Sequence, residues 1–288
     1  MDVRRLRFLL EFSRLGSMHE VAAELSTSTS NVSQAIAALA RDVGAPLVEP
    51  DGRRVRLTPA GRRLAEHAVA ILAAVDAARL DLDPSAEPAG VLRVAGFASA
   101  VTRSLIPAIG NLASIHPGVE VRVHEHEPLE CYDLLARDDV DLALTYDYNL
   151  APMAWRNDHA VTEIWDVEWG LGVPAGERRT SFTDFAGSDW IVNSRHTADE
   201  DVLRALATLA GFTPRVVHRI DSLELVDKLI VAGLGVALLP RSRASHSGVK
   251  LLPISDPGIR LRAYAVTRRG RDQWPPLRAL LHELEAAR

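Results

Sequence analysis

The sequence predicts an α/β protein in which a small helical module and one long helix precede a larger body of two α/β lobes. Short amphipathic helical patterns separated by capping signals fill the first 45 residues. A heptad pattern follows them, and strand–helix–strand alternation, which is typical of parallel sheets, fills the rest. The 288 residues are 47% hydrophobic and 25% charged, a globular composition that suffices for about two domains.

The charge distribution sets the N-terminal module apart from the rest of the chain. Residues 1–65 contain ten arginines and seven acidic residues, a net charge of +3, whereas the whole chain carries −5. This asymmetry is typical of a small basic module on a larger acidic body.

The composition also excludes several protein classes. A single cysteine, Cys131, rules out an intrachain disulfide and a thiolate-rich zinc site. No apolar run approaches the ~18 residues of a membrane span, and the charged N-terminus is unlike a signal peptide. We therefore expect a cytoplasmic protein with no membrane partner.

Two short helices are expected at the N-terminus. The first spans Asp2 to Leu15 and ends at Gly16, because glycine commonly follows the last turn of a helix. The second begins at Ser17, which together with Glu20 has the spacing of a capping box.

A third helix is expected after a turn at Ser26 and Thr27. Its apolar positions include Val32, Ile36 and Leu39, which share one face. Two short helices, a tight turn and a polar N-terminal end on the next helix make a helix-turn-helix, whose last helix lies in the major groove of DNA. The polar residues expected to face DNA are Thr29, Ser30, Asn31, Ser33 and Gln34. The alternative is a plain three-helix bundle with a solvated polar face.

A basic β-hairpin is expected directly after the third helix. Asp51-Gly52 is a strong two-residue turn signal between two short apolar runs. The hairpin carries Arg53, Arg54 and Arg56, which suits a wing that binds phosphates or the minor groove. The alternative for these arginines is a solvated surface.

The long helix is expected to begin at Thr58-Pro59, an N-cap followed by proline in the first turn, and to run to about Leu82. Its apolar seam alternates spacings of four and three, which favours homodimerisation through a zipper-like contact. The seam residues are Leu64, Ala68, Ile71, Val75, Ala78 and Leu82. The alternative is that the seam packs against the C-terminal body of the same chain.

The C-terminal body is expected to form two α/β lobes after a polar, proline-bearing hinge at residues 83–90. The expected strands are 91–96, 119–123, 140–145, 168–173, 190–193, 215–218, 236–239 and 262–267, and the expected helices are 105–115, 129–137, 199–210, 222–232 and 276–287. We expect domains at 1–58, 59–88 and 89–288, with lobe I at about 89–162 and 267–288 and lobe II at about 163–266. Ligands bind at the carboxyl ends of parallel strands, so a crevice between the lobes suits a small molecule.

Several residues resemble catalytic or metal-binding patterns without completing one. His124-Glu125-His126-Glu127 lacks a third ligand at a recognisable spacing, so we expect a polar strand end and no metal. Cys131 is expected to be a small buried side chain. Tyr146-Asp147-Tyr148 could contact a ligand or serve only in packing. No constellation of catalytic residues is present, so we expect neither an enzyme nor a cofactor.

The chain resembles the LysR-type transcriptional regulators over nearly its whole length. The resemblance is carried by Gly16-Ser17, Val32-Ser33-Gln34, Gly44-Ala45-Pro46-Leu47 and the run from Arg53 to Gly61, and further on by Leu92-Arg93-Val94, the runs 116–121 and 141–144, and the run 232–240. The family commonly has Gln-Pro where Thr29-Ser30 stand here, so the resemblance does not carry an operator sequence over to this chain.

The resemblance implies a winged helix-turn-helix, a dimerising linker helix and a two-lobed effector domain like periplasmic binding proteins. It implies homodimers or homotetramers on double-stranded DNA and a small-molecule co-inducer in the cleft. Carried over by position, the cleft residues are Ser99, Ala100, Thr145, Tyr146, Asn193, Ser194 and Ser222. Two alternatives are an enzyme or solute-binding protein that uses its N-terminal module only to dimerise, and a regulator whose cleft is filled by its own Trp165 or Trp169.

Overall fold

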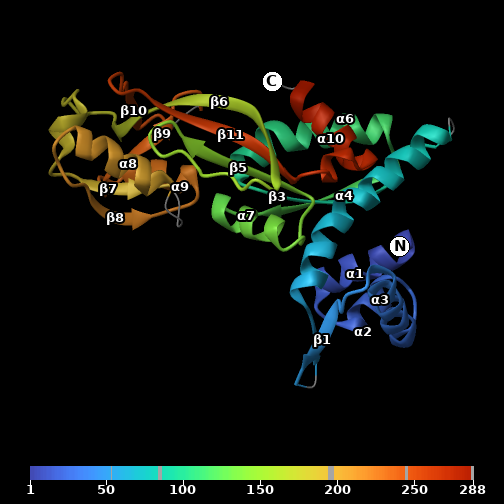
Figure 1. The fold of residues 1–288 in the computed structure, drawn as a ribbon. Coiled ribbons are helices and arrows are strands. Elements are labelled where there is room, and N and C mark those ends of the chain that lie inside the picture. The colour runs from blue at the N-terminus through green and yellow to red at the C-terminus, as the bar shows by residue number, and fades with distance from the viewer. Residues whose placement is uncertain (53, 84–85, 194–197, 244–245, 287–288) are drawn as a thin grey trace.

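The computed structural model describes residues 1–52, 54–83, 86–193, 198–243 and 246–286. Figure 1 shows a small N-terminal module joined by one long helix to an elongated C-terminal domain. The expected α/β fold class is confirmed. No helix among the described residues combines the length and apolar character that a membrane span requires.

The N-terminal module is a winged helix-turn-helix. Its elements are α1 (Val3–Leu15), α2 (Met18–Glu24), α3 (Thr29–Val43), β1 (Val48–Asp51) and β2 (Arg54–Leu57). Ser17 and Ser28 cap α2 and α3 by accepting backbone N–H bonds, and Gly16 and Gly44 end α1 and α3 in the left-handed conformation. A core that includes Leu6, Leu9, Val21, Val32, Ile36 and Leu39 holds the three helices together.

The linker helix α4 (Pro59–Leu82) begins as expected, with the Thr58 hydroxyl accepting from the Gly61 N–H. Its seam is divided between two environments. Ala68 is fully buried in the core of the winged module, and Leu64 and Ile71 pack partly against it. Ala78 and Leu82 are exposed, and Leu82 retains 85% of its accessible surface. The first half of the seam therefore packs within the chain, Val75 is half-buried, and the last two positions are exposed.

The C-terminal domain is built on one curved sheet of nine strands among the described residues, in the order β4-β3-β5-β11-β6-β9-β7-β8 with β10 beside β6. The strands are β3 (Gly90–Gly96), β4 (Val119–Glu125), β5 (Leu142–Tyr148), β6 (His159–Pro174), β7 (Asp189–Val192), β8 (Arg215–Arg219), β9 (Val236–Pro240), β10 (Val249–Leu252) and β11 (Ile259–Arg268). The helices are α5 (Ala98–Ala100), a π-helical turn η1 (Val101–Leu105), α6 (Ile106–Ile115), α7 (Pro128–Ala136), η2 (Phe182–Phe185), α8 (Ala198–Leu209), α9 (Leu223–Val231), η3 (Arg271–Gln273) and α10 (Pro275–Ala286).

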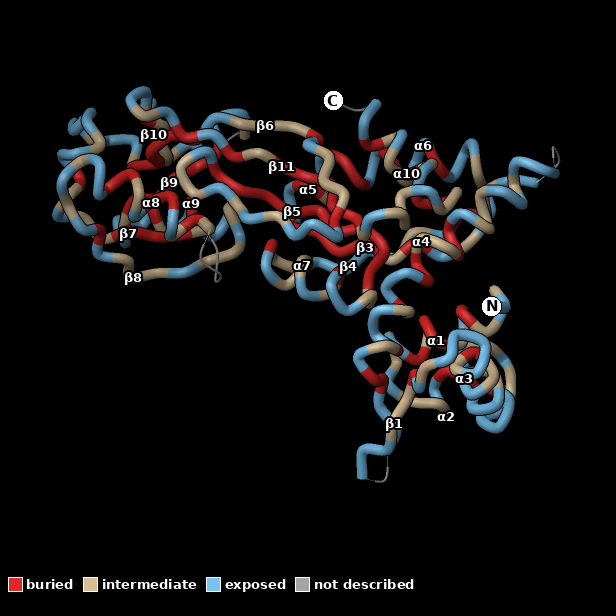
Figure 2. Tube along the Cα trace, viewed as in Figure 1, coloured by how far each residue is buried: buried red, intermediate tan, exposed pale blue. Residues whose placement is uncertain are grey.

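Two long antiparallel strands, β6 and β11, connect the two lobes. Lobe I contains the parallel strands β3, β4 and β5, and lobe II contains the parallel strands β7, β8 and β9. In Figure 1, α6 and α10 lie on one side of the lobe I strands and α7 on the other. Figure 2 shows that the buried residues follow these central strands through both lobes. The carboxyl ends of both parallel sets therefore border the region between the lobes.

Several strands differ from the sequence-based expectations, β5, β6 and β10 among them. β5 continues to Tyr148 instead of ending at Thr145, and β6 begins at His159, nine residues before the expected start. β10 was not expected. In each case apolar and polar residues do not alternate clearly at the strand boundary. β5 is buried on both faces, and the start of β6 and most of β10 are only half-buried.

Candidate functional site

The polar face of α3 lies on the surface of the winged module. Val32, Ile36 and Leu39 point into the core. The exposed residues of this face are Thr29, Ser30, Asn31, Ser33 and Gln34, which are the positions expected to face DNA. Two side-chain hydrogen bonds orient these polar residues. Asn31 Nδ2 donates to Oγ1 of Thr27, just before the helix, at 2.8 Å, and Gln34 Nε2 donates to Ser30 Oγ at 3.4 Å. Asn31 and Gln34 keep further donors and acceptors for base edges.

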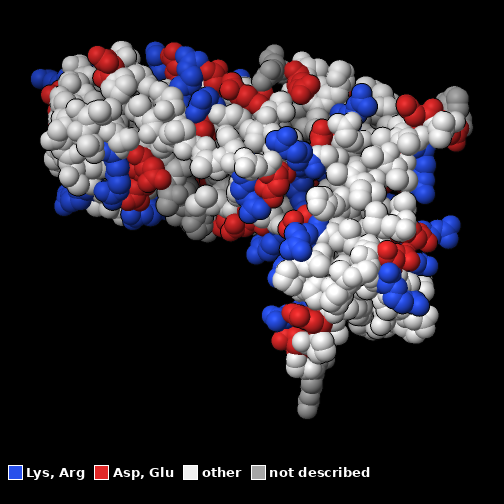
Figure 3. Space-filling view, in the orientation of Figure 1, with Lys and Arg blue, Asp and Glu red and all other residues white. Residues whose placement is uncertain are grey.

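The wing is a two-stranded hairpin whose turn contains Gly52 at φ +61°, a conformation that glycine adopts without strain. Arg56 pairs with Glu49 across the strands at 3.0 Å. Arg54 is exposed and lines a groove together with Ser17 and His19 from the start of α2. The expected contact residue Arg53 lies outside the described residues. On the face drawn in Figure 3, basic and acidic side chains are intermingled.

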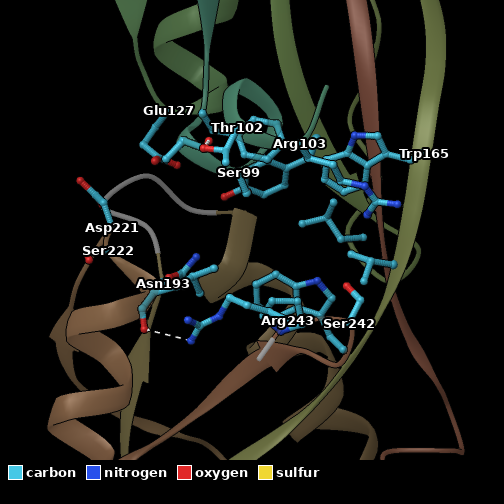
Figure 4. A pocket seen from close by; sticks show the side chains of 18 of the residues that line it. Ser99, Thr102, Arg103, Glu127, Trp165, Asn193, Asp221, Ser222, Ser242 and Arg243 are labelled. Atoms are coloured by element: carbon cyan, nitrogen blue, oxygen red, sulfur yellow. Dashed lines mark hydrogen bonds between the residues drawn. The ribbon is translucent and has the colours of Figure 1, made fainter. Parts of the chain in front are cut away.

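A cavity of about 580 Å³ lies between the two lobes. Lobe I, lobe II and the connecting strands all contribute to its wall, at the carboxyl ends of both parallel strand sets. The lining residues include Phe97, Ser99, Thr102, Arg103, Glu125, Glu127, Tyr146, Trp165, Trp169, Asn193, Asp221, Ser222, Ser242 and Arg243. Figure 4 shows Glu127 and Asp221 near one end and Arg103 with Trp165 near the other. Trp165 and Trp169 form walls and leave this cavity open, so they do not fill the cleft.

The Arg103 end of the cavity combines a cation with an aromatic face. The guanidinium carbon of Arg103 lies 4.5 Å from the ring centroid of Trp165, and Trp165 is held by a 2.8 Å bond from Nε1 to Ser104 Oγ. The structure records no carboxylate partner for Arg103 among the described residues. Arg243 differs, because its Nη2 already donates to Asp227 Oδ2 at 2.6 Å. Arg103 is therefore the better placed cation for an anionic ligand group.

Four of the seven expected cleft residues line the cavity: Ser99, Tyr146, Asn193 and Ser222. Ala100 and Thr145 do not line it, and this corrects the expectation. Both are fully buried. Thr145 lies inside β5, where alternate residues face opposite sides of the sheet, so Tyr146 reaches the cavity and Thr145 does not. Ser194 lies outside the described residues.

The carboxylates that line the cavity were not among the residues predicted from the sequence. Glu125 ends β4 and Glu127 follows it. β4 runs parallel to β3 with Glu125 beside Gly96, so the rule that ligands bind at the carboxyl ends of parallel strands points to this strand end. Asp221 is in the matching position after β8 in lobe II.

No metal site is formed by the described residues around His124–Glu127. His126 Nδ1 lies 3.3 Å from Glu130 Oε2, and no cluster of three or more His, Cys, Asp or Glu side chains in the described part of the chain could hold a metal ion.

Cys131 is a fully buried thiol in α7, and its sulfur lies 3.2 Å from the His126 carbonyl oxygen to which it donates. Burial raises the pKa of this thiol, and the nearby carboxylates of Glu127 and Glu130 raise it further. Because the thiolate is the reactive form, Cys131 is chemically shielded.

We expect Cys131 in the native protein to react with a thiol-specific disulfide reagent many times more slowly than a free cysteine at neutral pH, since both its burial and its raised pKa oppose thiolate formation. The measurement is the rate at which the reagent releases its coloured thiolate. The control is the same protein in denaturant, in which Cys131 must react promptly. Native reaction as fast as the denatured control would contradict this.

Comparisons with known proteins agree with this architecture. Residues 3–62 match the bacterial regulatory helix-turn-helix protein model of the lysR family, and residues 85–288 match the LysR substrate binding domain. This chain belongs to the LysR family of transcriptional regulators. Membership decides against the enzyme and solute-binding alternatives.

Individual LysR relatives match most of the chain. A "Probable hydrogen peroxide-inducible genes activator" of Mycobacterium avium is 29% identical over 91% of this chain and 88% of its own length. The transcriptional dual regulator GltC of Bacillus subtilis is 24% identical over 96% and 93%. Among solved structures, a full-length OxyR variant from Pseudomonas aeruginosa has a TM-score of 0.71 at 19% identity, covering 99% of this chain and 98% of its own. Full-length LysG from Corynebacterium glutamicum with bound effector Arg has a TM-score of 0.69 at 23% identity, covering 100% and 98%.

Proposed function

We propose that this LysR-family regulator reads operator DNA with the polar face of α3 and the wing, and that it responds to a small molecule held in the cavity between the lobes. The observation that supports this proposal is that the same chain contains two sites. One is the exposed polar face of α3, and the other is an open cavity between the lobes that polar side chains help to line. The site of action is then the cytoplasm, where the DNA lies. The exposed seam residues Ala78 and Leu82 support assembly into homodimers or homotetramers, since exposed apolar residues at heptad spacing favour a partner helix.

We propose an effector that carries an anionic group, such as a carboxylate, on a small body with an apolar side. Arg103 supports the anionic group, and Phe97, Tyr146, Trp165 and Trp169 supply apolar surface. The buried Oδ1 of Asn193 has no hydrogen-bond partner among the described residues and can accept from a donor group on the ligand. The LysG structure with bound arginine supports a metabolite of this size in a protein of the same fold.

We do not propose that this protein responds to peroxide, as the name of the Mycobacterium avium relative indicates for that protein. Such a response through sulfur chemistry requires an accessible thiolate, and the one cysteine of this chain is the buried Cys131.

The DNA-binding part is tested by mobility shift and footprinting on the DNA upstream of the gene, over a range of salt concentrations. We expect Arg54→Ala to weaken binding to all sequences and to reduce the salt slope by about 1, because one phosphate contact is lost. Arg178→Ala, which removes an exposed arginine of lobe II, is the control with the same change in charge. Equal salt slopes for the wild type and Arg54→Ala would contradict the wing assignment.

The effector part is tested by thermal shift and calorimetry with a panel of small carboxylates, amino acids among them. We expect Arg103→Gln to weaken binding of the best carboxylate roughly tenfold or more, because a charge-assisted hydrogen bond is lost. Arg122→Gln, an exposed arginine on β4 outside the cavity, is the control. If the carboxylate binds Arg103→Gln and Arg122→Gln with the same affinity, its anionic group does not contact Arg103.

A further inference from the structure

One buried carboxylate bridges the two lobes beside the cavity. Asp199 lies in the first turn of α8 and is 4% exposed. Its Oδ2 accepts the hydroxyl of Tyr146 at 2.6 Å, and its Oδ1 accepts the hydroxyl of Tyr148 at 2.5 Å. Each carboxylate oxygen therefore has a short bond from a separate tyrosine.

The two partners of Asp199 belong to the other lobe. Tyr146 and Tyr148 are alternate residues of β5 in lobe I, so their side chains lie on the same face of the strand. α8 belongs to lobe II and also packs against β7. Because these bonds span 51 and 53 positions of the sequence, they join parts of the fold that no local turn holds together.

One of these tyrosines lines the cavity, and the other packs against a lining residue. Tyr146 lines the cavity and meets Phe97 edge-to-face with ring centroids 4.7 Å apart. The ring centroid of Tyr148 lies 5.9 Å from that of Tyr146 and 5.3 Å from that of Trp169, another lining residue. A change in the position of Asp199 would therefore move aromatic side chains on which an effector rests.

Burial makes the hydrogen bonds between Asp199 and its two tyrosines costly to break. Burial raises the pKa of Asp199, and the two tyrosine hydrogen bonds oppose that rise. Burial, followed by the Asp199 charge, raises the pKa of Tyr148 well above its ordinary range, so its hydroxyl stays protonated as a donor. A buried carboxylate without its donors is costly, so separating the lobes at this point is opposed.

We propose that Asp199 is a positioning residue that latches lobe II onto lobe I through Tyr146 and Tyr148 and thereby sets the affinity of the interlobe cavity for its effector. The affinity part rests on the proposed function. The latch holds the binding-competent arrangement, and losing it lowers the fraction of molecules in that arrangement and hence the apparent affinity.

The latch is tested first without any ligand, by hydrogen–deuterium exchange of the full chain. Tyr148→Phe removes one hydroxyl in lobe I, and we expect exchange in the first turn of α8, in lobe II, to rise roughly tenfold. Tyr264→Phe is the matched control, because the Tyr264 hydroxyl also donates to a buried carboxylate, Asp147 of β5, at 3.1 Å, but from the neighbouring strand β11 and not from α8. Unchanged exchange in α8, or an equal rise in Tyr264→Phe, would overturn the latch.

Affinity is then measured with anilinonaphthalene sulfonate, a fluorescent aromatic anion. We expect Asp199→Asn and Tyr148→Phe to raise its Kd roughly tenfold, and Tyr264→Phe to leave it within twofold. If Arg103→Gln weakens the dye but Asp199→Asn does not, the positioning role is wrong. If α8 exchange responds as expected and Arg103→Gln has no effect on the dye, the latch stands and the proposed anion site fails.

Discussion

Replacing Asp141 with alanine is expected to lower the free energy of unfolding of the C-terminal domain by about 3–5 kcal/mol, because it leaves two largely buried guanidinium groups without their carboxylate. The Asp141 side chain is 1% exposed. It accepts from the backbone N–H of Arg93 at 2.9 Å and from the guanidinium groups of Arg93 and Arg271 at 3.2 Å and 2.8 Å. The measurement is thermal unfolding, with a drop in Tm of roughly 2–4 °C for each kcal/mol.

Acid should weaken the same contact in the wild type. Burial opposes ionisation of Asp141, but the Arg271 charge and the hydrogen bonds from Arg93 together hold the pKa of its carboxyl below the usual range. A lowered pKa in the folded state gives stability that is present above the unfolded pKa of about 3.9 and is lost as the pH falls through the folded pKa. The wild type should therefore lose more stability on acidification than Asp141→Ala does.

Asp158→Ala is the control for this prediction. Asp158 pairs with Arg156 at 2.7 Å, and the hydrogen bond from Arg156 lowers the Asp158 pKa to about 2, yet both side chains are more than half exposed. Solvent screens such pairs, so the expected loss is at most ~1 kcal/mol. Equal losses for the two variants would mean that burial does not strengthen the Asp141 contact.

The winged module was predictable in nearly all its parts, because its signals are local. Caps such as Ser17 and glycines such as Gly16 and Gly44 lie within a few residues of the helix ends that they define. The turn at Asp51-Gly52 likewise fixes its hairpin without help from distant residues.

The cavity was predictable only in part, because side-chain direction depends on strand boundaries. Position-by-position carry-over from the family that the chain resembles gave Ser99, Tyr146, Asn193 and Ser222 as cleft residues, and all four line the cavity. The carry-over failed at Thr145, since the strand continues for three more residues and turns that side chain away. The pairing of Asp199 with two tyrosines has no local signal at all, because only the tertiary fold brings them together.

The linker seam shows a different limit. Periodicity reveals that one face of a helix is apolar, but it does not reveal what covers that face. Leu64, Ala68 and Ile71 pack against the module of their own chain, whereas Ala78 and Leu82 are exposed. The heptad spacing is the same in both halves, so the sequence pattern does not distinguish them.

Replacing Gly270 with alanine is expected to loosen the joint between the linker helix and lobe I. Gly270 precedes η3 and adopts φ +85°. A Cβ there would lie 2.5 Å from the Cβ of Ala70 on α4 and 3.2 Å from its Cα, which is backbone that cannot rotate away. The expected loss is about 2 kcal/mol from overpacking, in addition to ~1 kcal/mol for alanine in the left-handed conformation. Thermal unfolding of the full chain measures both.

Gly211→Ala separates these two contributions. Gly211 has a similar φ of +80°, but nothing lies within 4 Å of an added Cβ, so this variant shows the backbone cost alone. Adding Ala70→Gly to Gly270→Ala removes the closest contact, and the double variant should be more stable than the sum of the two single changes by at least ~0.5 kcal/mol. Strict additivity would mean that Gly270 and Ala70 do not press on each other. A double variant that is more stable than the sum of the single changes would show that Gly270 of lobe I and Ala70 of α4 press on each other. Because α4 follows directly after the wing, the position of lobe I would then constrain the helix that carries the DNA-binding module.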